Sequence, residues 1–334
     1  MIISSAPLRL SLNGGGSDLP AFTKHHAGRV ISVPLDKRVY ITLHYSFDNG
    51  YRVAYSKIEN CRSIDQIQHK LVRFALEKVK WDGPGLEITS IADVPSTGTG
   101  LGASSAFTVA LLNGLYHLKG EKVSKNELAN AACEVEILLA KEPIGMQDQY
   151  ASAFGGLNQF DFLDRFNVLV EPIFLGKSKE EQVFLDEFNR SLLFFHVNLE
   201  RNANTILEYQ SKNIDLDTTN IDRSLSLVEL ATKTRNTVIL GDFETLGTLM
   251  TKGWEIKCEL NGDNKDPVLM DLLNWVKNSG IYGGKLLGAG GGGFLALLAH
   301  PSKHEMIRSD LGNRFREYNA KIVISGPTIQ TIGA

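Results

Sequence analysis

A glycine- and serine-rich segment at residues 95–106 carries the chemistry that can be read most directly from this chain. Its sequence is PSTGTGLGASSA, and it stands between a short apolar segment and an amphipathic one. Glycines permit a tight turn and let backbone amides approach a ligand with no Cβ between them. When such a loop opens a helix, its amides and the positive end of the helix dipole hold phosphate. The segment therefore predicts a phosphate-binding loop at Gly98–Ser105.

Other interpretations of this loop are weaker. A Walker A loop fails because the Gly-Lys-Ser sequence of the chain has Glu171 where the first glycine is required. Gly98–Ala103 satisfies the loose dinucleotide pattern G-x-G-x-x-A, but a polar turn stands where a second strand with an acidic end is needed. A serine nucleophile elbow requires a glycine where Ala106 stands. A plain strand-to-helix turn capped by Ser104 remains, although a cap requires only one small residue.

A second glycine cluster, KLLGAGGGGF, occupies Lys285–Phe294. It also satisfies G-x-G-x-x-G, but the apolar segment Phe294–Ala299 that follows is typical of a strand and not of the helix that dinucleotide binding requires. Four consecutive glycines are costly in chain entropy and offer no side chains for packing. A flexible hinge is one interpretation, and we prefer a close backbone approach to the ligand of the first loop.

A third glycine cluster follows an apolar alternation in Ala6–Asp18. Arg9 stands among leucines, so its charge is either solvated or buried with a partner. Asp18 follows the glycines and could cap a helix that begins at Leu19. Bare amides at Gly14–Gly16 could receive oxygen atoms of a ligand. Taken alone, a solvated arginine and a capping aspartate would account for both charged side chains.

Carboxylates in the middle of the chain supply further chemistry. Asp148 follows a Pro/Gly turn and precedes small residues. Glu134 and Glu136 lie in the apolar segment Ala131–Ala140, which predicts a helix with one of the two at the surface. A carboxylate that points inward requires a partner, and a metal ion is one such partner. The competing interpretation is that both glutamates are solvated residues on a helix face.

The composition excludes several classes of protein. The chain has 334 residues and a net charge of −3, which argues against binding nucleic acid through its phosphates. Hydrophobic residues are 43%, and no apolar run reaches the ~18 residues of a membrane helix. We expect no signal peptide, a cytoplasmic location, and reduced thiols at Cys61, Cys133 and Cys258. His300 and His304 lack a third metal ligand nearby and are expected at the surface.

The elements that must position these residues follow from hydrophobic periodicity. Strand alternation covers much of residues 1–56, and helical spacing recurs on both sides of residue 100. A capping box at Ser124 and Glu127 begins one of the helices. The segments expected to be helices are 64–80, 107–118, 124–141 and most of 202–278, and those expected to be strands are 86–91, 157–176, 192–197, 294–299 and 321–325.

A strand-rich first half and a helix-rich second half predict an α+β protein of two domains. The length agrees with this, at about 150 residues a domain. We expect the first domain to span residues 1–185 and the second 186–334. The phosphate loop and Asp148 would then come from the first domain, and the glycine-rich loop 288–293 from the second.

The three glycine clusters and Asp148, taken in order, resemble the kinase superfamily named for galactokinase, homoserine kinase, mevalonate kinase and phosphomevalonate kinase (GHMP). Its signature P-x-x-x-G-L-[GA]-S-S-A is similar to the segment from Pro95 to Ala106. This chain departs from the signature by one extra residue after Pro95 and by Ala103 before the serine pair. The matching motifs extend over residues 6–299.

The resemblance implies a two-domain GHMP kinase fold, with a ribosomal-protein-like first domain, a ferredoxin-like second domain and the active site between them. It implies ATP and Mg²⁺ as cofactors. Ser105 and Glu136 would bind the metal, Asp148 would be the catalytic base, and Arg9 would hold Asp148 ionised and stabilise the developing alkoxide. The implied ATP-binding residues are Gly98, Gly100, Leu101, Gly102, Ala103, Ser104 and Ser105.

The opening motif is most similar to that of the D-glycero-D-manno-heptose 7-phosphate kinases. This implies phosphorylation of the anomeric hydroxyl to give heptose 1,7-bisphosphate, for nucleotide-activated heptose and surface polysaccharide synthesis. Galactose is disfavoured because Gly15 replaces an acidic residue of galactokinase. The implied substrate-binding residues are Arg9, Gly15, Gly16, Asp18, Asp148 and Gly291, and the cationic candidates for the distal phosphate are Lys24, Arg29, Arg38 and Arg201.

Two alternatives stay open. An L-fucokinase- or galactokinase-like sugar 1-kinase would share the motifs. A non-catalytic sensor of nucleotide or sugar would share the fold, although a pure binding protein requires no base. The expected partners are ATP and a small sugar phosphate, with a homodimer as a further option and with neither nucleic acid nor a membrane.

Overall fold

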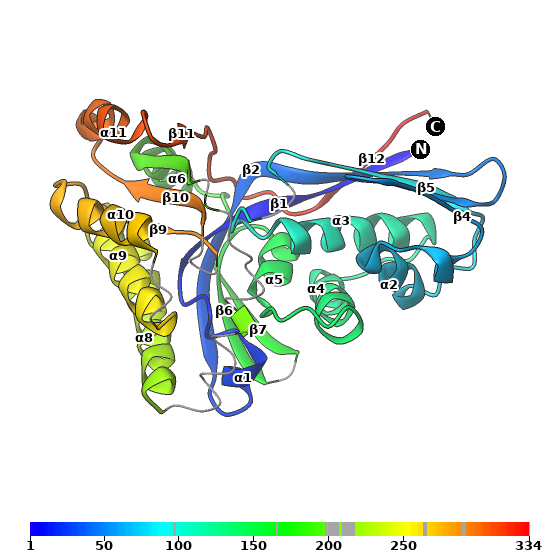
Figure 1. Cartoon of the computed structure of the whole chain (residues 1–334), viewed down its shortest axis with the longest axis horizontal. Helices are drawn as coiled ribbons and strands as arrows, with labels where there is room; N and C mark the ends of the chain where they lie inside the picture. Colours follow the sequence, from blue (N-terminus) through cyan, green and yellow to red (C-terminus); the bar gives the residue numbers. More distant parts are fainter. Residues whose placement is uncertain are drawn as a thin grey trace.

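The computed structural model describes residues 1–95, 98–164, 166–197, 199, 207–208, 218–262, 266–288 and 292–333. Two β-sheets organise these residues, one of eight strands and one of four. Figure 1 shows the larger sheet extending across the molecule, with one group of helices beneath it and a second group beside the smaller sheet. The arrangement is the α+β, two-layer type that the sequence predicts.

Strands β1 (Ile2–Asn13) and β2 (Gly28–Tyr45) form the centre of the larger sheet. β2 has 18 residues, and its two halves pair with different neighbours. The first half pairs with β6 (Leu157–Asp164) and the second half with β5 (Leu86–Ala92). The sheet therefore divides into two arms, and the β1–β2 pair belongs to both (Figure 1).

Four short strands complete the two arms. The edge order is β12-β1-β2-β5-β3-β4, and β7 extends the other arm beside β6. β3 runs parallel to β5, whereas β12 pairs antiparallel with β1. Their bounds are β3 Tyr51–Ala54, β4 Ile58–Cys61, β7 Asn167–Phe174 and β12 Thr328–Thr331.

The helices of the first half lie on one face of this sheet (Figure 1). The longest, α3 (Ala103–Leu118), packs on β1 and β2 through a face that includes the fully buried Leu111 and Leu115. This face is the one that the spacing of leucines predicts. The other helices here are α1 Pro20–Thr23, α2 Lys70–Lys78, α4 Lys125–Cys133 and α5 Gln147–Phe154.

The second half surrounds the smaller sheet, whose order is β11-β8-β10-β9 with antiparallel pairs throughout. Strand β8 has the predicted bounds, Leu192–Val197. The remaining elements are α6 Lys179–Ser191, α8 Thr218–Leu240, α9 Phe243–Leu260, α10 Pro267–Asn278, β9 Gly283–Leu286, β10 Gly293–Leu298, α11 His304–Leu311 and β11 Arg316–Glu317, with 3-10 turns at Ile64–Gln66 and Pro301–Lys303.

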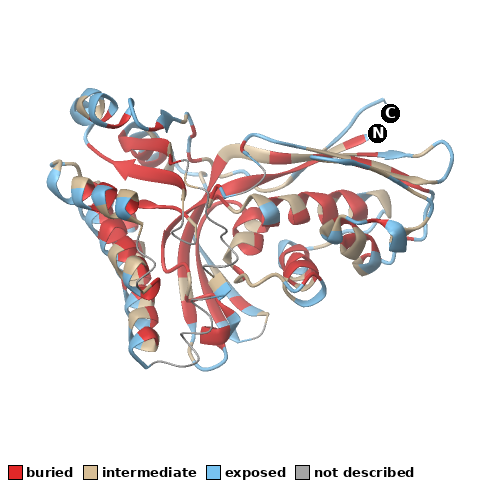
Figure 2. Ribbon diagram, in the orientation of Figure 1, coloured by how far each residue is buried: buried red, intermediate tan, exposed pale blue. Residues whose placement is uncertain are grey.

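The buried residues form two main clusters that follow the two sheets (Figure 2). The second cluster surrounds Trp254, between the smaller sheet and helices α9 and α10. The first cluster includes Phe188 of α6 and Met250 of α9 as well as the larger sheet. The expected division between residues 185 and 186 falls within α6, and β12 returns the chain to the larger sheet.

The expected helix at 64–80 is shorter than the hydrophobic spacing suggests. A 3-10 turn covers Ile64–Gln66, and α2 begins only at Lys70. Glu59 accepts hydrogen bonds from the backbone amides of Gln68 and His69, which fixes these residues in a non-helical turn. The His69 side chain then caps α2 by accepting from the Val72 amide. Periodicity could not reveal this because the acceptor lies outside the segment.

The expected last strand at 321–325 is wrong. In that segment Ile322 makes one isolated bridge to Leu35, and the final strand is β12, further along the chain. The ladder cannot extend beside Pro34, since proline has no N–H to donate. The expected helix 124–141 is correct at its start, where the Ser124–Glu127 capping box forms. Its end differs, because α4 continues as a π-helical segment, Glu134–Leu139.

In the described ranges, no helix combines the length and the apolar character that crossing a lipid bilayer requires.

The packing of α3 on the larger sheet leads to a first prediction, for Gly114→Ala. A Cβ at this position would lie 2.5 Å from Leu43 Cδ1 and 3.2 Å from Ser4 Cβ. Helix propensity alone would stabilise the alanine variant by about 1 kcal/mol. Overpacking of a buried site costs about 1–3 kcal/mol, so we expect a net loss of stability in chemical denaturation. The exposed His117→Ala in the same helix should change stability by less than about 0.5 kcal/mol, and a stabilised Gly114→Ala would contradict the packing.

Candidate functional site

The predicted phosphate loop lies at the N-terminus of α3. Gly98, Gly100 and Gly102 have φ angles of 70°, 69° and 75°, a left-handed conformation that favours glycine. The residues between them, Thr99 and Leu101, are buried. The loop is thus anchored by alternate side chains and leaves its glycine backbone more accessible.

Helix α3 begins without a side-chain cap in the described part of the chain, since its N-cap residue is Gly102. The first-turn amides of a helix have no partner within the helix itself. Together with the positive end of the helix dipole, these amides favour an anion at this position. Ala103, Ser104 and Ser105 form that first turn, so the predicted loop has the geometry that phosphate binding needs.

Arg9 connects strand β1 to this loop and to a carboxylate. Its backbone N–H donates to Leu101 O at 3.1 Å, and its Nη1 donates to Gly100 O at 2.6 Å. Its Nε and Nη2 donate to the two carboxylate oxygens of Asp148 at 2.8 and 2.9 Å. The Arg9 side chain is only 3% exposed, so a paired charge holds strand, loop and carboxylate together.

Asp148 lies in the first turn of α5. A Cβ on Gly102 would lie 3.2 Å from its carboxyl carbon, so the carboxylate stands beside the start of α3. Its side chain is 24% exposed, unlike that of Arg9. The carboxylate therefore has an open side from which it could accept a proton from a ligand held at the loop.

The second glycine cluster touches the first loop backbone to backbone. A Cβ on Gly100 would lie 2.3 Å from Leu287 O, and one on Gly288 would lie 2.5 Å from Gly100 Cα. At the other end of the cluster, Phe294 N donates to Thr99 O at 3.2 Å. Side chains at these glycines would separate the two loops. The described part of the cluster thus contacts the loop itself, and the expected approach to the ligand of the loop stays a prediction.

Glu136 is completely buried, whereas Glu134 lies at the surface in an ion pair with Lys78. Glu136 Oε1 accepts from Ser104 Oγ at 2.7 Å, and Oε2 accepts from Gln149 Nε2 at 2.6 Å. Burial raises the pKa of the Glu136 carboxyl to about 7, and hydrogen bonds from Ser104 and Ser105 partly oppose this rise. Both glutamates lie in the π-helical segment, and because they are two residues apart they point in nearly opposite directions, with Glu136 toward the interior.

The oxygen atoms around Glu136 fit a hard cation. They comprise a desolvated carboxylate and the Ser104 and Ser105 hydroxyls at the phosphate loop. Gln149 Oε1, also at this position, is buried with no hydrogen-bond partner in the described structure. Mg²⁺ commonly takes one or two carboxylates and completes its shell with phosphate and water.

Asp18 connects the opening glycines to the segment before Asp148. It accepts hydrogen bonds from Gly16 N at 2.8 Å and from Gln147 N and Nε2, both at 3.1 Å. Burial raises the pKa of its carboxyl, and these hydrogen bonds oppose the rise. The capping role that we considered for Asp18 is wrong, because α1 has Leu19 at its N-cap and no side-chain cap.

Gly15, in the opening glycine cluster, is closely surrounded by polar side chains. A Cβ on Gly15 would lie 3.0 Å from both side-chain amide atoms of Gln147 and 3.2 Å from Ser11 Oγ. A side chain at this position would require the end of the Gln147 side chain to move. Ser11 Oγ and Gln147 Oε1 are buried without a partner among the described residues, so acceptors and a hydroxyl are available here.

Two buried lysines of the second half reach the same region, and the sequence analysis did not identify them. Lys257 Nζ donates to Gly288 O at 3.0 Å, and Lys285 Nζ donates to Leu12 O at 3.2 Å. The sequence spacing indicates that Lys257 is buried, because it continues the stripe of buried residues of α9 that contains Met250 and Trp254. A charge on an apolar stripe is informative, because lysine is rarely buried unless it has a partner.

The cationic residues that we expected to bind the distal phosphate of the substrate are not free at the loop junction in the described structure. Arg29 pairs with Asp161 at 2.6 Å, and Arg38 donates to Ser5 Oγ at 2.9 Å, so both already have partners. Lys24 is exposed. Arg201 and Gly291, which we expected at the substrate, lie outside the described residues.

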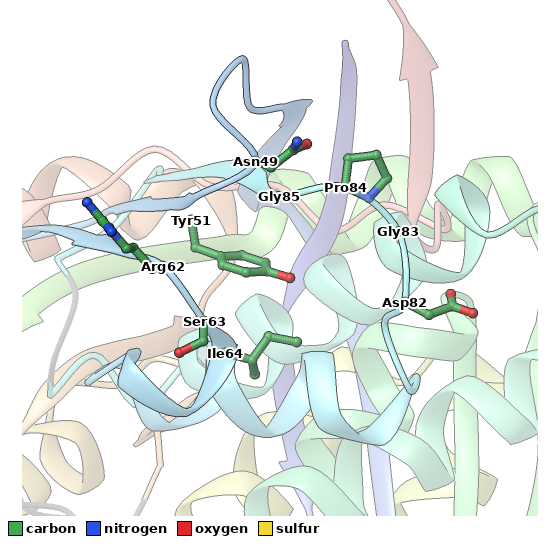
Figure 3. Close-up of a pocket in the computed structure, with 9 residues that line it drawn as sticks. All are labelled: Asn49, Tyr51, Arg62, Ser63, Ile64, Asp82, Gly83, Pro84 and Gly85. Atoms are coloured by element: carbon green, nitrogen blue, oxygen red, sulfur yellow. The ribbon is translucent and has the colours of Figure 1, made fainter.

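A groove of about 690 Å³ opens beside α2, at the end of the sheet remote from the smaller sheet (Figures 1 and 3). Its lining includes Tyr51, Arg62 and Asp82 and none of the predicted site residues. The concentration of paired charges, glycine backbone and α3 amides makes the junction of the loops, and not this groove, the candidate active site. Chemically, that junction offers a phosphate cradle, a cation site and a carboxylate paired with a guanidinium.

Comparison with known proteins finds relatives whose similarity extends over nearly the whole chain. A D-glycero-alpha-D-manno-heptose 7-phosphate kinase from Campylobacter jejuni is 26% identical over 321 residues, which is 90% of each chain. The L-fucokinase/L-fucose-1-P guanylyltransferase from Bacteroides fragilis is also 26% identical, over 88% of this chain and 34% of its own. The crystal structure of a D-glycero-D-manno-heptose 1-phosphate kinase from Bacteroides thetaiotaomicron superposes with a TM-score of 0.81 at 22% identity, covering both chains completely.

Two family profiles match the two halves of the chain. The GHMP kinases N terminal domain matches residues 68–156, which contain the phosphate loop, Glu136 and Asp148. The GHMP kinases C terminal domain matches residues 231–317, which contain Lys257 and the second glycine cluster. Family profile, relatives and fold agree with the resemblance found in the sequence, and the chain belongs to the GHMP kinases.

Proposed function

We propose that the protein transfers the γ-phosphoryl group of ATP to the anomeric hydroxyl of a sugar. The observation that carries this proposal is the pairing of Arg9 with Asp148 directly beside the open N-terminus of α3. A protein that only binds nucleotide needs the α3 terminus but not a positioned carboxylate. The pair therefore supports catalysis over the sensor that we considered.

The phosphate groups of ATP would lie on the loop Gly98–Ser105. The free amides at the start of α3 and the accessible glycine backbone support this placement. Phosphoryl transfer depends mainly on positioning and on stabilising charge, so a rigid loop is of direct use. Contact with the second glycine cluster provides that rigidity.

Ser105 and Glu136 would hold Mg²⁺, and Ser104 contacts the same carboxylate. When bound, Mg²⁺ would neutralise negative charge that develops on the phosphoryl group during transfer. The protein itself contributes the Glu136 carboxylate, which accepts hydrogen bonds from the side chains of Ser104, Ser105 and Gln149. Because this carboxylate is buried, its ionisation is costly without a cation.

Asp148 would accept the proton of the attacking hydroxyl. Its position near Gly102 and its open side support this role. Arg9 would orient the Asp148 carboxylate through two charge-assisted hydrogen bonds and would stabilise the developing alkoxide. The proton passes to Asp148 as the hydroxyl oxygen attacks phosphorus and ADP departs.

For the acceptor we propose D-glycero-D-manno-heptose 7-phosphate, with its 1,7-bisphosphate as the product for nucleotide-activated heptose synthesis in the cytoplasm. The Campylobacter relative supports this acceptor, and the filled space at Gly15 supports exclusion of galactose. The unpartnered polar atoms of Ser11 and Gln147 would suit sugar hydroxyls. L-Fucose is the second candidate, since the Bacteroides fucokinase is equally similar in sequence.

Asp148→Asn tests the base. Loss of a general base lowers turnover by about 10² to 10⁴-fold, so we expect ADP release to fall by that order. Nucleotide affinity, measured by calorimetry, should stay within a few-fold because the phosphate loop is unchanged. Since the substitution leaves the buried Arg9 charge without its carboxylate, thermal unfolding should be recorded alongside. Turnover near that of the unchanged protein would rule out this role for Asp148.

Glu136→Gln tests the metal site, with Glu134→Gln as its matched control. We expect the Mg²⁺ concentration for half-maximal turnover to rise strongly for Glu136→Gln and to change little for Glu134→Gln, whose position is at the surface. Gln149 could rotate its amide to accept from the new glutamine, so the fold should be retained. Equal effects of the two substitutions would contradict the assignment of Glu136.

The raised pKa of Glu136 also predicts a pH dependence of stability without Mg²⁺. A carboxyl with a folded-state pKa above its unfolded value favours folding below the unfolded pKa, and this contribution is lost as pH rises through about 7. Burying the ionised group then costs about 3 kcal/mol. Glu136→Gln should therefore be more stable than the unchanged protein at pH 8 and nearly equal at pH 4, in metal-free thermal melts. The same difference at both pH values would be inconsistent with this ionisation.

The acceptor is tested by measuring ADP release with a panel of free and phosphorylated hexoses and heptoses. We expect the largest kcat/KM for heptose 7-phosphate and a much lower value for unphosphorylated heptose, because binding energy from a remote group helps to position the reacting end. A larger kcat/KM for L-fucose or galactose would exclude the heptose assignment and leave the kinase assignment intact.

A further inference from the structure

Lys257 is a buried cation that the proposed reaction has not yet used. It lies in α9 and is 8% exposed. Its Nζ donates to Gly288 O at 3.0 Å, and Gly288 in turn packs against Gly100 of the phosphate loop. The ammonium group is thus one residue away from the contact between the two glycine loops.

Among the described residues, the Lys257 ammonium has fewer hydrogen-bond acceptors than it has N–H donors, and it has no carboxylate in direct contact. Lysine has three N–H donors, and Gly288 O is the one acceptor that the described residues provide. No carboxylate among those residues lies within 4.0 Å of Nζ. A buried charge without a counter-ion is costly and normally indicates a ligand of opposite charge.

The neighbouring charges indicate where that ligand lies. The hydrogen bond to Gly288 O places the ammonium at the contact between the two glycine loops, and the charges of Asp18, Arg9 and Asp148 lie near enough to influence the pKa of Lys257. Burial lowers the pKa of Lys257 to about 8, and Asp18 opposes the change. Lys285, also buried, lies close enough to act on both Lys257 and Arg9. Lys257, Lys285 and Arg9 are therefore three cationic groups near the loop junction. Of these three, Arg9 is paired with a carboxylate, that of Asp148.

We propose that Lys257 binds a γ-phosphoryl oxygen of ATP and follows that oxygen through the transfer. This inference deepens the proposed function and rests on it. As the bond from the γ-phosphorus to ADP breaks and the bond to the acceptor oxygen forms, the acceptor proton goes to Asp148. Lys257 stays protonated and supplies charge only. Its bond to Gly288 O aligns the ammonium with the loop junction.

The test compares Lys257→Met with Lys257→Arg, and uses Lys252→Met as the control. Methionine keeps the length and apolar stem of the lysine, and Lys252 is an exposed lysine of the same helix. Calorimetry with Mg²⁺ measures the affinity for ADP and for a non-hydrolysable ATP analogue with an imido link, which differ in the γ-phosphoryl group. A hydrogen bond to a charged group corresponds to about 10- to 100-fold in affinity.

We expect Lys257→Met to weaken binding of the ATP analogue by about 10- to 100-fold while ADP affinity changes by less than about threefold. Turnover with the sugar found active in the panel should fall at an unchanged acceptor KM. Lys257→Arg should recover part of both losses, and Lys252→Met should match the unchanged protein. Unaltered ADP affinity also shows that the methionine variant is folded at the site.

Two results would overturn the inference. In the first, ATP analogue and ADP weaken equally, which means that Lys257 only holds the glycine loop through Gly288. In the second, affinity for the sugar phosphate falls and the nucleotides bind normally, which assigns the lysine to the acceptor. If the unchanged protein phosphorylates no sugar, the proposed acceptor fails, but the comparison of the two nucleotides still decides whether Lys257 contacts the γ-phosphoryl group.

Discussion

The buried guanidinium of Arg9 is the group on which the arrangement of the site depends. A buried charge must be paired and hydrogen-bonded, and the Arg9 guanidinium finds its partners in two other segments, the Asp148 carboxylate and Gly100 O of the phosphate loop. The backbone N–H of Arg9 donates to Leu101 O in the same loop. These contacts fix strand β1, the phosphate loop and the start of α5 relative to one another. Removing one partner would leave the charge uncompensated, so the same interaction that orients the proposed base also constrains the fold.

The glycines have a second, complementary role. Gly100 and Gly288 lie so close that a side chain on either would separate the loops. This contact joins a loop from the first half of the chain to one from the second half. Because neither loop carries side chains there, backbone amides and the α3 terminus remain accessible to a phosphate group. The charged side chains that approach this junction, Arg9 and Lys257, come from elements behind the loops.

The carboxylates at the site differ in their surroundings. Asp148 is paired with arginine and partly open to solvent, which suits proton transfer. Burial raises the pKa of the Glu136 carboxyl, although its hydroxyl and amide donors oppose the rise, and a desolvated carboxylate with neutral neighbours suits a cation. Asp18 is buried and saturated by backbone and amide donors, which suits a structural link between the opening glycines and Gln147. Three similar side chains thus support three different roles, because their partners differ.

The sequence by itself determined the phosphate loop, the Arg9 and Asp148 candidates and most of the helices and strands, since these depend on local spacing and residue type. It also favoured Glu136 over Glu134, but only through the resemblance. The tertiary structure decided what depends on distant partners: the start of α2, set by Glu59, the burial of Glu136, and the hydrogen bonds that join Asp18 to Gln147. The sequence shows that Lys257 lies on an apolar stripe, but only the packing of α9 reveals its partner, Gly288 O, because the two residues are distant along the chain.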